Sequence, residues 1–326
     1  MLKPQATGLL GPASLDALLA GLIDYAGLFP PASLDMNSAV ENYARYLAGP
    51  YARALGRFVL PVSRFTEFEE VFAHVQPLEP WGISALVGPN YEADLAAVDK
   101  FNERHVQQAY VDAIEVKAAT PDEISRIRAY VRGTITPYFE IRPFDCTEML
   151  QTIHHIRGRA KIRTGGVTPD TIPPSDIVAG FLIECAKLEV PFKATAGLHH
   201  PIRCQKPLTY EPDAPIGGMH GFLNVFIAAI VSWAGGKTIT CRSEFEVRPG
   251  AKMQAPFPFH MGETDLSHIK RLLQTISPFD FREDGIYAPA QLPKSVIELA
   301  RHNFAISFGS CSFEEPIEDL GALNLL

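Results

Sequence analysis

The sequence predicts an α/β protein, a (β/α)8 TIM barrel with a long insertion between the seventh and eighth strands. Short apolar runs recur at intervals of about 25 to 30 residues, and one segment with helical spacing lies between each pair, which is the pattern of a parallel sheet. No glycine-rich dinucleotide fingerprint follows the early runs, which disfavours a doubly wound sheet. The chain of 326 residues can hold a barrel of about 250 residues and an insertion.

Each element is predicted from its own residues. The expected strands are 21–29, 58–62, 83–87, 111–116, 135–141, AKIRTGG at 160–166, PFKATAG at 191–197, and 304–308. Helices are expected at 91–105, 146–156 and 175–188. The pairs Thr66/Glu69 and Thr120/Glu123 have capping-box spacing and predict two further helix starts.

The excess length lies in the segment 204–292, which is rich in Pro and Gly and has helical patterns near 221–233 and 265–276. We interpret the chain as a single TIM-barrel domain, 1–326, in which 204–292 is an insertion that elaborates one face of the barrel.

Composition restricts the classes of partner. The formal net charge of −8 argues against nucleic acid or an anionic membrane surface as a partner. The longest apolar run, 221–234, is too short to span a bilayer. The five cysteines are scattered without a CxxC pair, so a disulfide framework or zinc ribbon is not expected. We predict a soluble cytoplasmic protein that acts on a small molecule without a cofactor, and leave a homo-oligomer open.

Two lysines carry the functional argument. Lys161 and Lys193 each lie in a buried strand just before glycine, and a buried lysine is costly unless it is paired or used. Strands that are neighbours in sequence are neighbours in a barrel, so both ammonium groups are expected in one cavity. Like charge and desolvation lower a lysine's pKa, and a neutral lysine can form a Schiff base. The sequence predicts that one lysine reacts and the other lowers the pKa of the first.

The alternative is a purely structural role for both lysines, in ion pairs with Asp24, Asp112, Glu115 or Glu140 inside the barrel. Two sets of candidates on the 111–116 strand have opposite parity, because side chains alternate along a strand. Either Asp112 or the pair Glu115 and Lys117 faces the lumen, unless a bulge intervenes. Burying Glu115 and Lys117 outward would be costly, which favours them as inward, but both alternatives stay open.

Five short motifs resemble class I deoxyribose-phosphate aldolases in the family's order. They are Leu22–Leu28 with Asp24, Val111–Ile114 with Asp112, Lys161–Gly165, Lys193–Gly197, and Gly309–Ser312. The resemblance covers the barrel from about residue 22 to residue 319 and skips the insertion. It implies an aldolase-type barrel in which Lys161 forms the Schiff base, Lys193 assists it, and Asp112 shuttles protons through a water.

The loops after the last strands are candidates for binding an anionic group of the substrate. Their backbone amides and hydroxyls could hold a phosphate or carboxylate, and the candidates are Gly165, Gly166, Gly197, His199, Gly309, Ser310 and Ser312. Arg163 lies on the same strand face as Lys161 and suits bidentate contact with such a group, or else pairs with Glu140.

The leading hypothesis is a lyase of aldolase type that joins a lysine to a small, phosphorylated or carboxylated carbonyl compound. Two alternatives remain. One is a metal-assisted hydrolase or hydratase that uses His199, His200 and His220 as ligands, although no ligand-spaced motif such as HExxH occurs. The other is a non-catalytic barrel that binds a small anion.

Overall fold

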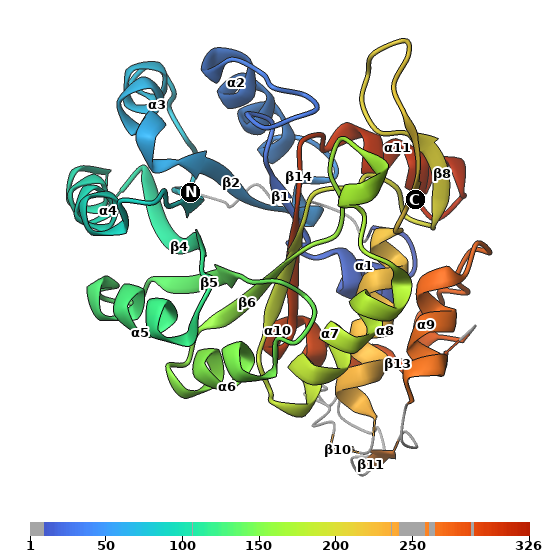
Figure 1. Cartoon of the computed structure of the whole chain (residues 1–326). Coiled ribbons are helices and arrows are strands. Elements are labelled where there is room, and N and C mark those ends of the chain that lie inside the picture. Colours follow the sequence, from blue (N-terminus) through green and yellow to red (C-terminus); the bar gives the residue numbers. More distant parts are fainter. Residues whose placement is uncertain (1–9, 106, 236, 241–257, 261–264, 288–289) are drawn as a thin grey trace, which may run out of the picture.

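The structure, a computed structural model, describes residues 10–326 except 106, 236, 241–257, 261–264 and 288–289. Eight parallel strands close into a barrel in the order β1-β14-β7-β6-β5-β4-β3-β2, with helices around the outside (Figure 1). The closed ring of parallel strands confirms the predicted (β/α)8 architecture. No helix among the described residues is long and apolar enough to cross a membrane.

The barrel strands agree with the predicted ranges to within a few residues. They are β1 (Ile23–Tyr25), β2 (Leu55–Pro61), β3 (Trp81–Leu86), β4 (Ala109–Lys117), β5 (Thr136–Glu140), β6 (Arg159–Arg163), β7 (Phe192–Thr195) and β14 (Ala305–Ser310). The largest difference is in β1, which keeps only three residues of the predicted nine because the chain turns directly after Tyr25.

Nine helices outside the insertion follow or precede these strands among the described residues. They are α1 (Ala13–Leu19), α2 (Met36–Leu47), α3 (Phe65–Phe72), α4 (Tyr91–His105), α5 (Pro121–Tyr130), α6 (Thr147–His155), α7 (Ser175–Lys187), α10 (Lys294–Asn303) and α11 (Glu314–Ala322). Short 3-10 turns occupy Ala52–Ala54, Val62–Arg64 and Pro169–Thr171.

One of the two predicted capping boxes is present in part, because the Glu123 carboxylate bonds the backbone N–H of Ala119 and not that of Thr120. Thr120 accepts a hydrogen bond from the Glu123 backbone N–H at the start of α5, as its position before Pro121 suggests. The prediction for Thr66 was wrong. Helix α3 begins one residue earlier, at Phe65, so Thr66 lies within the first turn and cannot act as its cap.

The chain between β7 and β14 contains both additions to the barrel and part of its outer layer. Its elements are β8 (Cys204–Pro207), β9 (Ile216–Met219), α8 (Phe222–Ala234), β10 (Thr238–Thr240), β11 (Pro258–His260), α9 (Leu266–Gln274), β12 (Gly285–Ile286) and β13 (Leu292–Pro293). Helix α8 lies on the barrel wall, since Phe226 stacks against Phe192 of β7 and packs against Phe308 of β14. Segment 204–292 therefore supplies part of the helical layer as well as an elaboration.

Asn224 fastens this helix to its neighbours. Its amide donates to the carbonyl oxygens of Leu272 and Thr275, both at 2.8 Å, and its Oδ1 accepts from the Arg203 backbone N–H at 2.9 Å. A fully buried amide with three partners satisfies backbone groups that would otherwise be left unpaired in the core.

We predict that Asn224→Ala lowers the free energy of unfolding by about 2 to 4 kcal/mol, because three backbone groups that are buried or partly buried lose their partner. Urea denaturation followed by circular dichroism measures the change. Asn303→Ala, which removes two exposed contacts, to Leu299 and His302, is the control and should be nearly neutral. Equal effects of the two substitutions would contradict the role given to Asn224.

Candidate active site

Lys161 and Lys193 lie directly opposite each other in adjacent strands. The register of β6 with β7 pairs the two residues, and both side chains are buried, with 3% of Lys161 and 1% of Lys193 exposed. Their ammonium groups contact carboxylates from β1, β4 and β5, which only the barrel lumen brings together. The expected neighbourhood of the two lysines is therefore present.

Glu115 bridges the two lysines. Its Oε2 lies 2.8 Å from Lys161 Nζ, and its Oε1 lies 2.5 Å from Lys193 Nζ. Glu115 Oε1 also accepts a hydrogen bond from the Ser84 hydroxyl at 2.7 Å. A fully buried carboxylate is tolerated here because each of its oxygens faces an ammonium group.

Each lysine has a second carboxylate partner. Glu140 Oε2 is 2.7 Å from Lys161 Nζ, and Asp24 Oδ2 is 2.7 Å from Lys193 Nζ. Asp24 also accepts from the Ser307 hydroxyl at 2.7 Å. Three carboxylates thus surround two ammonium groups, and the group as a whole carries a formal charge of −1 when both lysines are protonated.

The electrostatics differ from the sequence-based prediction. Burial alone would lower the pKa of Lys193, but Asp24 and Glu115 together raise it above its usual range. Burial would likewise raise the pKa of Glu115, but the two lysines hold it well below its usual range, and Lys161 does the same for Glu140. The carboxylate between the lysines screens them from each other, so Lys193 is held protonated by its anionic partners.

A bulge in β4 explains which of its residues faces the lumen, Asp112 or Glu115. The pairing of β3 with β4 skips one residue, Asp112, between Val111 and Ala113. After this extra residue Glu115 points to the lysines. Lys117, the last residue of β4, is exposed at the barrel mouth and does not join the carboxylate group.

Asp112 belongs to a different pair. Its carboxylate accepts two hydrogen bonds from the Arg57 guanidinium, at 2.6 and 2.8 Å, near the starts of β2 and β4. Catalysis in TIM barrels takes place at the opposite, C-terminal ends of the strands. The expectation that Asp112 stands beside the lysines is corrected: Glu115 occupies that place.

The mouth of the barrel opens into a cavity beside Lys161. The cavity has a volume of about 840 Å³ and lies at the C-terminal ends of β4, β5 and β6. Its wall includes Glu140 and Arg163, and Arg163 Nε lies 3.6 Å from Glu140 Oε1. Arg163 is thus a distant ion-pair partner of Glu140, and about half of its side chain surface is exposed.

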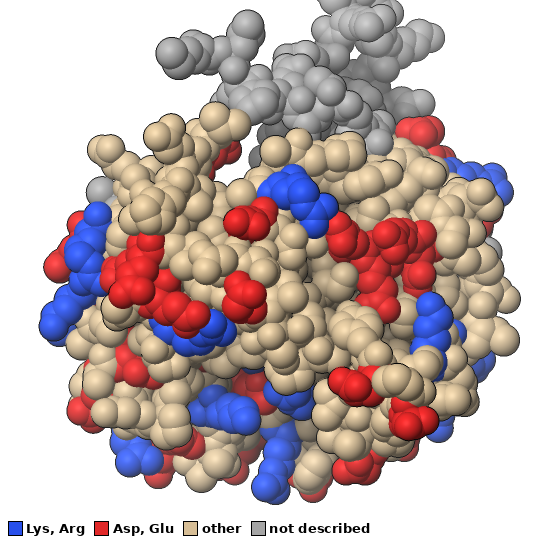
Figure 2. Space-filling view, turned by 90° about the horizontal axis from the view of Figure 1, so that it is seen from above, with Lys and Arg blue, Asp and Glu red and all other residues tan. Residues whose placement is uncertain are grey.

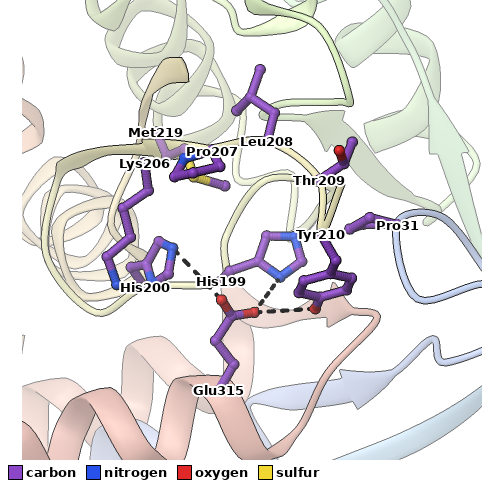
Figure 3. Close-up of a pocket in the computed structure, with 10 residues that line it drawn as sticks. All are labelled: Pro31, His199, His200, Lys206, Pro207, Leu208, Thr209, Tyr210, Met219 and Glu315. Atoms are coloured by element: carbon purple, nitrogen blue, oxygen red, sulfur yellow. Dashed lines mark hydrogen bonds and ion pairs between the residues drawn. The ribbon is translucent and has the colours of Figure 1, made fainter. Parts of the chain in front are cut away.

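The opposite side of the mouth is filled by the loops after β7 and β14 (Figure 3). His199 Nδ1 lies 3.3 Å from Glu315, and the Tyr210 hydroxyl donates to the same carboxylate at 3.5 Å. His200 pairs with Asp319 at 2.6 Å and also lies 3.8 Å from Glu315. These contacts tie the segment after β7 to α11 and leave a small pocket of about 190 Å³.

The predicted glycine and serine candidates come together only in part. The backbones of Gly165 and Gly197 are in close contact, since a Cβ on Gly165 would lie 2.8 Å from the Gly197 Cα. Gly197 has a φ of +75°, which glycine adopts without strain. Ser312 accepts from the Glu315 backbone N–H at 3.1 Å, and Ser310 is buried without a partner among the described residues. Gly166 and Gly309 instead face Thr171 and Thr195.

The three histidines of the metal hypothesis do not form one group. His220 Nε2 bonds the Pro173 carbonyl at 2.8 Å, away from the carboxylates that His199 and His200 contact. Within the described residues, no set of three His, Cys, Asp or Glu side chains has the geometry to hold a metal ion.

Sequence reasoning identified the lysines and Glu115 but gave Glu140 only as a structural partner. Glu140 lies opposite Lys161 in the β5–β6 register, which could have identified it as a member of the group around the lysines. Nothing in the sequence pointed to Ser84, Ser307 or Glu315, because single hydroxyls and helix carboxylates are common on any surface or strand.

Comparison with known proteins adds little. No family model matches this chain, and no curated protein matches it. Among solved structures, it is similar to a deoxyribose phosphate aldolase from Aeropyrum pernix, described as tetrameric, with 14% sequence identity and a TM-score of 0.37. That similarity covers 58% of this chain and 84% of the aldolase chain, and it is too remote to support an argument about function.

We predict that His199 stabilises the fold in a pH-dependent way. Burial would lower its pKa, but hydrogen bonds to Cys311 and Glu315 raise it from 6.5 to about 9. Because the pKa is higher in the folded state, the stabilisation is complete below pH 6.5 and is lost as the pH rises through 9. The difference in unfolding free energy between wild type and His199→Gln should therefore shrink by up to about 3 kcal/mol between pH 6 and 10.

Urea denaturation at several pH values measures this difference. His154→Gln, an exposed histidine of α6, is the control and should show no such trend. A difference for His199→Gln that stays constant from pH 6 to 10 would show that the imidazole is not held protonated by Glu315.

Proposed function

We propose that the protein is a lyase of aldolase type, in which Lys161 forms a Schiff base with a small carbonyl substrate that carries a phosphate or carboxylate group. One observation carries the proposal. Lys161 is buried between Glu115 and Glu140 beside an open cavity, at the end of the barrel where chemistry takes place in this architecture. Lys161 does not line the cavity itself, but its partner Glu140 does, and Glu140 and Glu115 are the groups that could take its proton.

The surroundings of the two lysines favour Lys161 as the nucleophile. Lys193 contacts Asp24, Glu115 and the face of Tyr138, at 5.5 Å from the ring centre, and none of these three lines the cavity. Lys161 is joined to the cavity wall through Glu140. Lys193 then serves as a fixed positive charge that keeps Glu115 ionised.

The proposed chemistry moves protons within this group. Lys161 gives a proton to Glu140, and its neutral amine attacks the carbonyl carbon. Glu140 returns that proton to the carbinolamine oxygen, which leaves as water, and a protonated imine is formed. Glu140 or Glu115 then takes the proton of the hydroxyl on the β carbon, the bond between the α and β carbons breaks, and its electrons pass into the imine to form an enamine. Protonation of the enamine and hydrolysis release the second product and restore Lys161.

Arg163 is proposed to hold the anionic group of the substrate. Its guanidinium is half exposed at the cavity and is held only loosely by Glu140, at 3.6 Å. A planar guanidinium with free donors suits a carboxylate or a phosphate.

We also propose that the protein is soluble and cytoplasmic, and that it acts on a small molecule without a cofactor. A homo-oligomer is left open. On the face drawn in Figure 2, acidic and basic side chains are interspersed, which is not the footprint of a nucleic-acid-binding surface.

A non-catalytic barrel that binds a small anion is the second candidate. It is favoured by the same ion pairs, because a lysine with two carboxylate partners is also what a structural core requires. Ligand-induced thermal stabilisation without imine formation would be its signature.

The first prediction for this function concerns covalent trapping. Borohydride reduction in the presence of a panel of anionic aldehydes and ketones should label wild type on Lys161, as found by peptide mass mapping. Lys161→Ala should abolish both labelling and turnover. Lys187→Ala, on the exposed face of α7, is the control and should label as wild type does. A label on another lysine, or none across the panel, would refute the assignment.

The second prediction concerns Lys193. In Lys193→Met, Glu115 loses one cation and holds a proton on Lys161 more strongly. Imine formation should therefore fall at neutral pH and recover as the pH rises, with roughly a tenfold change for each pH unit of the shift. Lys193→Arg keeps the charge and should retain more imine formation than Lys193→Met.

The measurement is the rate of imine trapping between pH 6 and 10, with circular dichroism to verify that each variant folds, since unpairing Asp24 and Glu115 costs about 3 to 5 kcal/mol. A Lys193→Met profile with the wild-type midpoint would show that the charge of Lys193 does not act on Lys161.

A further inference from the structure

The cavity beside Lys161 has a wall of mixed character. Lys117, Arg142 and Arg163 contribute three cationic side chains, and Phe144 and Met149 contribute apolar surface. At about 840 Å³, the cavity lies within the range of roughly 300 to 1,000 Å³ found for sites that enclose a whole small molecule. It is far larger than the pocket of about 190 Å³ on the opposite side of the mouth.

Two of the three cationic side chains on this wall have no ion-pair partner in the part of the chain that the structure describes. Among the described residues, no carboxylate lies within ion-pair distance of Lys117 or Arg142, and Arg163 reaches only Glu140. Glu140 also contacts Lys161 at 2.7 Å, so Arg163 is not its only partner. Unpaired cations that converge on a cavity favour an anionic ligand.

Two other acidic residues line the same cavity. Glu123 accepts a hydrogen bond from the Ala119 backbone N–H at 2.7 Å, so its charge is used to fasten the start of α5. Asp145 is exposed in the loop after β5. Arg163 lies two residues beyond Lys161 along β6, so at least one of the three cations adjoins the lysine.

The apolar part of the wall is exposed in this structure. Phe144 has 52% of its surface accessible, and it lies in the same loop as Arg142. A single exposed aromatic side chain is common on protein surfaces, but Phe144 lines the cavity together with Met149 and the cations, so a bound ligand can contact it. A ligand that fits both parts has an anionic group and an apolar body.

The glycine-rich ends of β6 and β7 leave less room for an anion. The backbones of Gly165 and Gly197 press against each other, and Ser312 is occupied by the start of α11. The open cavity at β4, β5 and β6 is thus the better place for the remainder of a substrate whose carbonyl meets Lys161.

We infer that this cavity selects the substrate, which is an anionic carbonyl compound with an aromatic or other apolar body, bound by Arg142, Arg163 and Lys117 at its charge and by Phe144 at its body. This inference rests on the proposed function for the role of the carbonyl group. The binding of the charge and of the body can be tested independently of the chemistry.

Three probes separate the parts of such a ligand. 2-Oxo-4-phenylbutanoate has the ketone, the carboxylate and the aromatic body, pyruvate lacks the body, and 4-phenylbutan-2-one lacks the carboxylate. Isothermal titration of the full chain at fixed salt should give a dissociation constant for 2-oxo-4-phenylbutanoate at least tenfold lower than for either truncated probe. The same ranking is expected in Lys161→Ala, where no imine contributes.

Variants of the wall assign the two contributions. Phe144→Ser should reduce the preference for 2-oxo-4-phenylbutanoate over pyruvate to less than threefold. Arg142→Ala should raise the dissociation constants of both acids at least fivefold and leave that of 4-phenylbutan-2-one unchanged. Arg126→Ala, on an exposed position of α5 outside the cavity, is the control and should change none of the three.

The outcomes separate the two proposals. Binding with the expected dependence on Phe144 and Arg142, but without borohydride labelling of Lys161, would refute the Schiff-base chemistry and keep the cavity assignment. Labelling of Lys161 by pyruvate and 2-oxo-4-phenylbutanoate with equal affinities that Phe144→Ser does not change would overturn the cavity assignment alone. Failure of all three probes to bind wild type at millimolar concentration would also overturn it.

Discussion

The lumen of this barrel is organised around Glu115, which contacts both buried lysines at once. From it a chain of alternating charges runs outward, through Lys193 to Asp24 on one side and through Lys161 to Glu140 on the other. Each charged side chain in this series is tolerated in the interior only because its oppositely charged neighbour is present. Since the five residues come from five strands, closure of the barrel and the formation of this group are a single event.

The imbalance of charge in this group has a chemical consequence. Three carboxylates and two ammonium groups leave one negative charge in excess, which favours a cation on the Nζ of Lys161. A protonated imine is such a cation, and it keeps the charge that the lysine had before reaction. The excess negative charge of the group would thus stabilise the proposed intermediate, with Lys193 compensating part of the excess.

The sequence was sufficient for the strand order and for the two lysines, because the βα period and the cost of a buried ammonium group are local properties. It was not sufficient for their electrostatics. The register that brings Asp24 and Glu115 to Lys193 depends on barrel closure and on one extra residue, Asp112, in β4. The sequence named Asp24 and Glu115 as possible partners, but nothing local marks such a bulge, so it did not show that both contact Lys193 and reverse its expected pKa shift.

The two sides of the barrel mouth differ because the insertion occupies only one of them. On the side of β7 and β14, ion pairs of His199 with Glu315 and of His200 with Asp319 fasten the segment that leads into the insertion against α11. On the side of β4, β5 and β6, the described residues leave the cavity with Glu140 and Arg163 on its wall. In the proposed reaction, a ligand would therefore approach Lys161 past Glu140, because the pairs with α11 fill the side of β7 and β14.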